Sequence, residues 1–340
     1  LHVRIALFSS FFFLLFCLFV LKTTHFCTLS SHPIRSVYNY CTNAKIKVSN
    51  AGIGGGANKG GGANFVGEEL YSRVTGLLKR HMKDLLREAE SKEIGEPLMR
   101  FYSAEWTKFT TAMKHLNHVF NYLNRYWVKR ETEDGRKEVY EVYTLSVVIW
   151  RDHLFSALKS RLTASVMAVL EAERNGETTD SVLVKTIINS YISIGLNKDR
   201  PKEPSLQIYR EFFCDEYLTA TEGYYARESS QFISTHSISE YLHKVSDHST
   251  PSPLLFSSTL TSFCLHFHHQ AHHRMAEEKD RSVQYLHSST EAEVTERLKR
   301  VLIERHLDQI WADFQHMLED DRREDMAFMY DLLSMVTGGL

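Results

Sequence analysis

Apolar residues recur alternately four and three positions apart, and the most regular run of this kind lies between Phe101 and Glu173. Such spacing places side chains on one face of a helix. The first half of the run carries one apolar stripe: Tyr102, Trp106, Phe109, Met113, Leu116, Phe120, Leu123 and Trp127. The polar segment 129–137 follows and contains Asp134-Gly135, a pair typical of turns. Because the period resumes at Val139, the pattern predicts two long antiparallel helices joined by a hairpin.

Helical spacing also marks the rest of the chain, starting with an apolar face in 68–90. Thr179 can cap the helix that Gly195 ends, and Thr290 with Glu293 has the spacing of a capping box. Strand-like alternation is scarce and the 340 residues include only six prolines. The sequence therefore predicts an all-α fold, in which a succession of similar helices is typical of an α-solenoid.

Charge and cysteine content narrow the class of protein. The chain has 40 basic and 42 acidic residues, a net charge of −2, which gives no polyelectrolyte character and disfavours nucleic acid as a partner. Its five cysteines are an odd number and form no CxxC pair, which indicates a reducing compartment rather than a disulfide framework. We therefore expect a protein of the cytoplasm and nucleus with a protein partner.

The chain contains none of the short motifs that carry common catalytic or phosphate-binding chemistry. HExxH, GxSxG and a phosphate-binding loop are all missing from the sequence. His115, His118 and His153 lie on or beside apolar helix faces, where hydrogen-bonded structural histidines are commoner than catalytic ones. The sequence therefore predicts a protein that is not an enzyme and holds no cofactor.

Several segments carry a specific resemblance to a known family: Tyr38–Asn43, Gly61–Tyr71, Asn121–Phe155, Glu171–Glu177, Tyr224–Phe232, Val283–Thr290 and Val301–Leu307. In these segments the chain resembles the N-terminal region of the cullin family, and most of all the cullins that are scaffolds of SCF-type ubiquitin ligases. The resemblance covers most of residues 37–245 and 274–340.

The resemblance implies a cullin-repeat helical stalk, an α-solenoid of five-helix repeats. Residues 37–175 would form an incomplete first repeat, 176–300 a second repeat interrupted by 246–273, and 301–340 the start of a third. The likeness does not include the region of a cullin that binds the RING subunit and is modified by neddylation. We therefore expect neither RING binding nor ligase activity from this fragment.

The resemblance also implies a partner. In cullins a Skp-type adaptor docks on the second helix of the first repeat together with the long helix that here holds Tyr122–Trp127, and an F-box protein on the adaptor carries the substrate. The implied function is that of a non-catalytic scaffold in protein ubiquitination and ubiquitin-dependent degradation. Aromatic anchors in a shallow groove suit such an interface. The candidate adaptor-binding residues are Val37, Tyr38, Cys41, Tyr122, Asn124, Tyr126 and Trp127.

Residues 1–36 lie outside the resemblance. The run from Ile5 to Leu21 is apolar and at the short end of what spans a bilayer, with His2 and Arg4 as a basic flank. One interpretation is translated non-coding sequence or a mispredicted exon. The alternative is a genuine anchor, which would make the protein a membrane-anchored helical tether.

The segment 246–273 interrupts what would otherwise be one helix, because Pro251 and Pro253 cannot lie inside it. Cys264 and the histidines beside it raise the hypothesis of a zinc site, since thiolate and imidazole are preferred zinc ligands. Their spacings match no structural zinc pattern, so no metal is predicted. We interpret the segment as a retained intron, with a flexible loop as the alternative.

Overall fold

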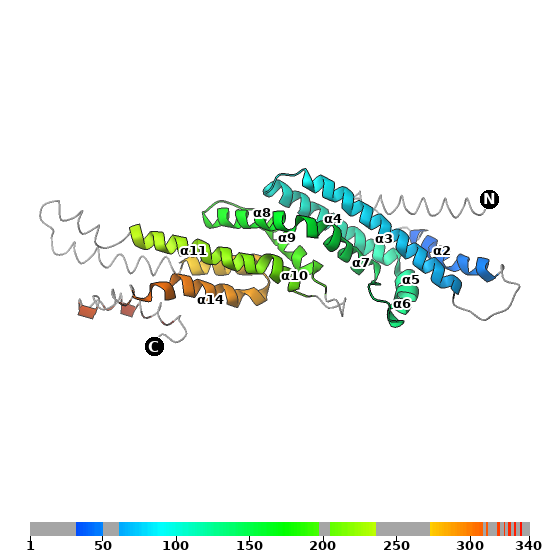
Figure 1. Cartoon of the computed structure of the whole chain (residues 1–340). Helices are drawn as coiled ribbons and strands as arrows, with labels where there is room; N and C mark the ends of the chain where they lie inside the picture. Colours follow the sequence, from blue (N-terminus) through cyan, green and yellow to red (C-terminus); the bar gives the residue numbers. More distant parts are fainter. Residues whose placement is uncertain are drawn as a thin grey trace. The chain divides into compact units, whose positions relative to one another are not determined.

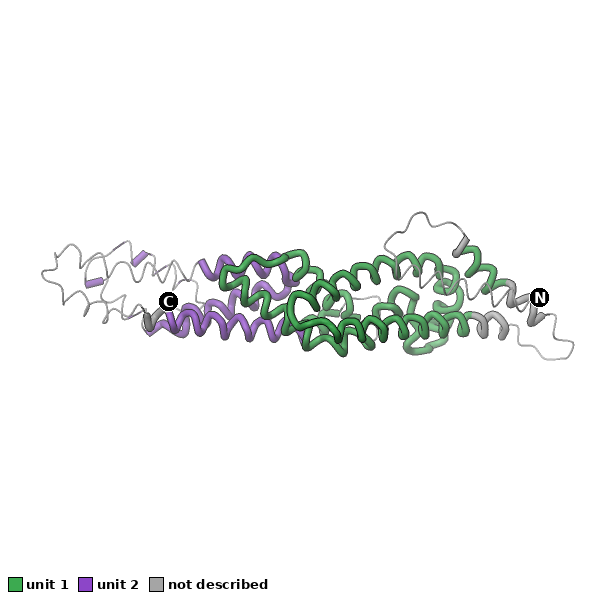
Figure 2. The backbone as a smooth tube through the Cα atoms, turned by 90° about the horizontal axis from the view of Figure 1, so that it is seen from above, with its two compact units in different colours: residues 1–209 green, residues 210–340 purple. Residues whose placement is uncertain are grey.

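The computed structural model describes residues 32–49, 61–196, 205–235 and 273–308, together with a few positions between 311 and 334. Within these residues every regular element is a helix, which confirms the all-α prediction (Figure 1). The chain divides into two compact units, residues 1–209 and 210–340 (Figure 2). The repeat boundaries expected after 175 and 300 stay a prediction, and residues 1–31 and most of 246–273 lie outside the described part.

The first unit is a bundle of α-helices that also includes two π-helical turns. Its elements in chain order are α2 (His32–Ser49), α3 (Gly61–Glu90), α4 (Glu96–Val119), α5 (Asn121–Leu123), η1 (Asn124–Val128, π), α6 (Lys129–Glu133), α7 (Val142–Trp150), η2 (Arg151–Phe155, π), α8 (Ser156–Arg174), α9 (Ser181–Ile194) and α10 (Gln207–Tyr209).

The predicted helical hairpin is present. The Gly95 N–H at the start of α4 donates to Ser165 Oγ late in α8 at 2.9 Å, whereas near the end of α4 the side chain of Asn117 receives the Tyr143 N–H at 3.1 Å. This reversed order of contacts makes α4 antiparallel to α7–α8. The prediction was less accurate about the break, because helical structure continues through Glu133 and the first helix is interrupted at Phe120, where the apolar stripe itself continues.

Aromatic side chains fill the centre of the hairpin. The fully buried Trp150 ring packs against Tyr102, Trp106 and Phe109, with centroids 5.7, 5.3 and 4.8 Å away. Trp150 Nε1–H also donates to Tyr102 Oη at 3.2 Å, and this hydroxyl lies 3.1 Å from Ser190 Oγ in α9. The buried polar groups of Trp150, Tyr102 and Ser190 therefore have partners, as a stable core requires.

Helix ends in the first unit follow local capping chemistry. α9 is capped by Asp180, whose carboxylate accepts the Leu183 N–H at 3.2 Å, and the expected cap, Thr179, donates instead to Glu173 at 2.8 Å.

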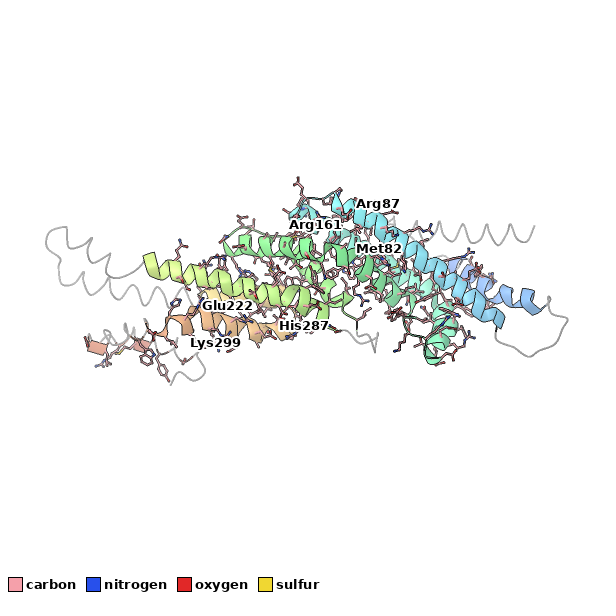
Figure 3. The ribbon with its side chains drawn as sticks, in the orientation of Figure 1. Met82, Arg87, Arg161, Glu222, His287 and Lys299 are labelled. Atoms are coloured by element: carbon pink, nitrogen blue, oxygen red, sulfur yellow. The ribbon has the colours of Figure 1, made fainter. Side chains whose placement is uncertain are left out.

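The long α3 buries one side, including Met82, and exposes charged residues such as Arg87 on the other (Figure 3). The helical structure of such an amphipathic segment is stabilised mainly by the packing of its apolar side against the bundle.

The second unit contains η3 (Arg210–Cys214, π), α11 (Asp215–Thr235), a helix over 273–285, η4 (Ser288–Thr290, 3₁₀), α14 (Glu291–Leu302) and η5 (Glu304–His306, 3₁₀). α11 packs along α14, and the Arg297 guanidinium of α14 donates a hydrogen bond to Glu222 Oε2 of α11 at 2.6 Å (Figure 3). Thr290 lies at the N-cap of α14 as expected. The capping box does not form, however, because the Thr290 side chain makes no capping hydrogen bond and Glu293 pairs with Arg210 at 2.5 Å.

A buried ionic network joins α11 to the helix 273–285. The Glu278 carboxylate is fully buried and accepts hydrogen bonds from Tyr217 Oη at 2.5 Å and Tyr225 Oη at 2.9 Å. It also pairs with the buried guanidinium of Arg281. These three donors compensate the carboxylate for the water it loses, which is the condition for burying a charge.

Candidate protein-interaction surface

The predicted interface residues lie on α2, α5 and η1, which the fold brings together because α2 packs against α5 and η1 follows α5 directly (Figure 1). The Tyr38 ring of α2 meets the Tyr122 ring of α5 edge-on, with centroids 5.1 Å apart. Tyr122 in turn packs on Tyr126 of η1 at 4.5 Å. We call Tyr38, Tyr122 and Tyr126 the tyrosine surface.

The tyrosine surface is open to solvent. Tyr126 is 60% exposed and Tyr38 is 49% exposed, whereas Tyr122 between them is half-buried. Burial raises the pKa of the Tyr122 phenol, with smaller contributions from Cys41, Tyr38 and Tyr126, so this hydroxyl stays a neutral hydrogen-bond donor. Exposed tyrosines with an apolar body and a polar tip are well suited to protein contacts.

Val37 and Cys41 lie on the side of α2 that faces the bundle. Both side chains are buried, with 2% and 8% of their surface exposed. They are four residues apart and therefore share one face of the helix. Since a partner cannot reach them, they contribute to this region by packing α2 onto the bundle.

Asn124 is also buried, and its side-chain amide hydrogen-bonds to residues of α4 and α7. Its Nδ2 donates to Asn117 Oδ1 at 2.8 Å, while its Oδ1 accepts the Val142 N–H at 3.1 Å. Asn117 Oδ1 also accepts the Tyr143 N–H at 3.1 Å. The two asparagines thus satisfy the free N–H groups at the start of α7, which would otherwise lack partners.

Trp127 anchors η1 to α3. Only 5% of its surface is exposed, and its ring packs on Tyr71 with centroids 4.9 Å apart. A methyl group added at Gly67 would lie 2.4 Å from Trp127 Cδ1, so only glycine allows this close approach. Tyr71 Oη in turn accepts the Tyr140 N–H at 3.0 Å and donates to the Tyr140 carbonyl at 3.1 Å, which holds the segment before α7.

The π-helical turn η1 sets which side chains face inward. Buried residues recur every four positions here, in the pairs 119–120, 123–124 and 127–128. A regular α-helix would rotate such a stripe by about 40° at each repeat, since it turns about 100° per residue. The wider π turn takes up this difference. As a result Asn124 and Trp127 stay inside while Tyr126 stays outside.

The described residues contain neither a membrane span nor a metal cluster. No helix among them is long and apolar enough to cross a membrane, and no group of three His, Cys, Asp or Glu residues could hold a metal ion. The apolar run at 5–21 and the histidine-rich part of 246–273 lie outside the described ranges, so these findings do not extend to them.

Comparison with known proteins decides the family. The family model described as the cullin alpha solenoid domain matches residues 30–250 and 256–340. The chain belongs to the cullin family. The matched domain is a scaffold rather than a catalytic domain, in keeping with the lack of catalytic motifs. The sequence pattern sets the segment 246–273 apart, but only residues 251–255 of it fall outside the family match. The interruption at 246–273 therefore stays a prediction.

Cullin-1 proteins of three organisms are similar to the chain. Cullin-1 of Dictyostelium discoideum is 44% identical over 304 residues, which is 89% of this chain and 36% of the relative. Cullin-1 of Schizosaccharomyces pombe is 31% identical and that of Caenorhabditis elegans 30%, each over 90% of this chain. These two alignments cover 36% and 37% of the relatives, so the chain spans little more than a third of their length.

Some residues that shape the surface of this cullin were missed by the sequence reading. Asn117, Gly67 and Tyr71 position η1 and α7 without contacting solvent extensively, and none was a candidate. Asn117 did carry a signal, because it is a polar residue next to the apolar stripe of α4. Gly67 and Tyr71 acquire their roles only from contacts with residues some sixty positions later, which no local pattern encodes.

Proposed function

We propose that the chain is a scaffold segment of an SCF-type cullin-RING ubiquitin ligase that holds a Skp-type adaptor and, through it, an F-box substrate receptor. The observation that carries the proposal is the exposed tyrosine surface, formed where α2 packs on α5. Its support is the cullin membership and the identity of 44% with a cullin-1. The chain would act in ubiquitin-dependent degradation in the cytoplasm and nucleus, without ligase chemistry of its own.

The candidate residues then divide by role. Tyr38, Tyr122 and Tyr126 would contact the adaptor, because large aromatic side chains supply most of the energy of protein interfaces. Val37, Cys41, Asn124 and Trp127 would act indirectly, by holding in place the elements that carry the tyrosines.

Calorimetric titration of the full chain with a purified Skp-type adaptor bound to an F-box protein tests the proposal. We expect the Tyr126→Ala variant to bind roughly thirtyfold more weakly, which corresponds to about 2 kcal/mol for a buried anchor. Tyr330→Ala is the matched control, because Tyr330 is also 60% exposed but belongs to the second unit.

Equal loss of affinity in Tyr126→Ala and Tyr330→Ala would reject the tyrosine surface as the docking site. Absence of binding by a natively folded chain would reject the adaptor itself. A folded state is verified for each variant by circular dichroism before titration.

A further inference from the structure

The tyrosine surface is built on segments without acidic residues. Neither α2 nor residues 106–130 contain an Asp or a Glu. Both segments carry exposed cations, and each lies three residues from one of the tyrosines: Arg35 before Tyr38, Arg125 after Tyr122 and Lys129 after Tyr126. Residues three apart lie on neighbouring positions of a helix surface. We call Arg35, Arg125 and Lys129 the basic rim.

Several carboxylates on the neighbouring elements already pair with cations. The pairs are Glu69 with Arg73 at 2.5 Å, Glu68 with Arg136 at 3.0 Å, Glu131 with Arg136 at 3.0 Å and Glu133 with Lys129 at 3.8 Å. Of the rim, only Lys129 takes part in one of these pairs, and that pair is long and exposed. Arg35 and Arg125 form no ion pair with any residue the structure describes. The rim therefore leaves positive charge around the tyrosines uncompensated.

We propose that the basic rim selects a partner whose docking face carries carboxylates around the patch that receives the tyrosines. The inference rests on the proposed function of this surface, and it assigns the acidic docking face to the Skp-type adaptor. Charges at the edge of an interface mainly raise the association rate and exclude partners of like charge. The aromatic contacts keep the partner bound. The basic rim raises its association rate and excludes partners whose docking face is positively charged.

The test compares association kinetics of two double variants of the full chain. Arg35→Glu with Arg125→Glu reverses the rim, and Lys79→Glu with Lys83→Glu reverses two exposed lysines on α3 as the matched control. Both changes lower the net charge equally, so a non-specific effect of total charge is the same in both. Adaptor bound to an F-box protein is the analyte, and rates are measured by biolayer interferometry from low to high salt.

We expect the rim variant to associate on the order of tenfold more slowly at low salt, while its dissociation rate stays close to that of the unchanged chain. The difference shrinks as salt rises, because the screening length falls from about 10 Å at 0.1 M to about 3 Å at 1 M. The control double variant associates like the unchanged chain apart from a small general effect.

Several results would overturn the inference while leaving the proposed function intact. One is equal association rates for the rim and control variants, in a chain whose binding still depends on Tyr126. A second is a loss confined to dissociation and insensitive to salt, which would mean direct contact rather than charge selection. A third is a single-stranded oligonucleotide that binds through the rim while adaptor binding ignores it. No adaptor binding by the unchanged chain would overturn both proposals.

Discussion

The Tyr38 ring of α2 meets the Tyr122 ring of α5 edge-on, 5.1 Å between centroids, although the two residues are 84 positions apart in the chain. This arrangement is the geometry that aromatic pairs prefer. It joins two helices into one exposed aromatic surface that continues to Tyr126. Neighbouring residues on the same elements are buried, so the exposed surface and the packing of the bundle are made by different side chains.

Adjacent aromatic residues on η1 should therefore respond differently to truncation. Trp127→Ala should lower the free energy of unfolding by about 3–5 kcal/mol, because it empties a buried site against Tyr71. Tyr126→Ala should change it by less than about 0.5 kcal/mol, since Tyr126 is exposed. Urea unfolding followed by circular dichroism measures both. Equal losses would contradict the separation of roles.

Glycines of α3 provide a matched pair. Gly67→Ala should destabilise the chain by about 1–3 kcal/mol, because the added methyl would overlap the Trp127 ring. Gly76→Ala has no atom within 4 Å of the new methyl and should stabilise α3 by roughly 0.5–1 kcal/mol. Melting temperatures of the two variants and of the unchanged chain measure these changes in stability. A Gly67→Ala variant as stable as Gly76→Ala would show that η1 can shift away from α3.

High pH should weaken the fold through its buried tyrosines. Burial raises the pKa of Tyr102 to about 12 and that of Tyr71 to about 12, from 10.0. The folded state then keeps these protons where the unfolded chain releases them, so stability is complete below pH 10 and is lost between pH 10 and 12. Each tyrosine contributes about 2–3 kcal/mol to this loss.

Tyr102→Phe tests the pH dependence, because phenylalanine keeps the ring and cannot ionise. Urea unfolding from pH 9 to 11.5 should show a shallower decline for Tyr102→Phe than for the unchanged chain. Tyr126→Phe, at an exposed position, is the control and should follow the unchanged chain. Parallel curves for all three proteins would mean that Tyr102 ionises as easily in the folded state as in the unfolded one.

The ionic network of the second unit should be sensitive to loss of charge. Glu278→Gln keeps the size of the side chain but removes the carboxylate charge that pairs with the buried Arg281, and it should cost about 3–5 kcal/mol. The neighbouring Asp280→Asn, at an exposed position, should change stability by less than about 0.5 kcal/mol. Chemical denaturation of the two variants distinguishes them. A Glu278→Gln variant as stable as the unchanged chain would show that the tyrosine hydrogen bonds alone suffice at this site.

Sequence periodicity determined the helical class and the antiparallel hairpin. Apolar stripes are local, since positions three and four apart share a helix face whatever lies opposite. The resemblance to cullins, rather than this pattern, pointed to α2 and the region 122–127 as candidate interface, and the family was confirmed by the family match. Local spacing was less reliable for caps, where Asp180 rather than Thr179 caps α9.

Only the tertiary structure decided which candidate residues are exposed to solvent and which hold the bundle together. Tyr126 and Trp127 are neighbours of similar chemistry, and their separation depends on the π turn η1 and on the space left by Gly67. Asn124 is buried because the start of α7 needs acceptors for its free N–H groups, and Asn117 completes the set. These partners come from other segments of the chain, so their effect arises from packing in three dimensions and no local sequence pattern contains it.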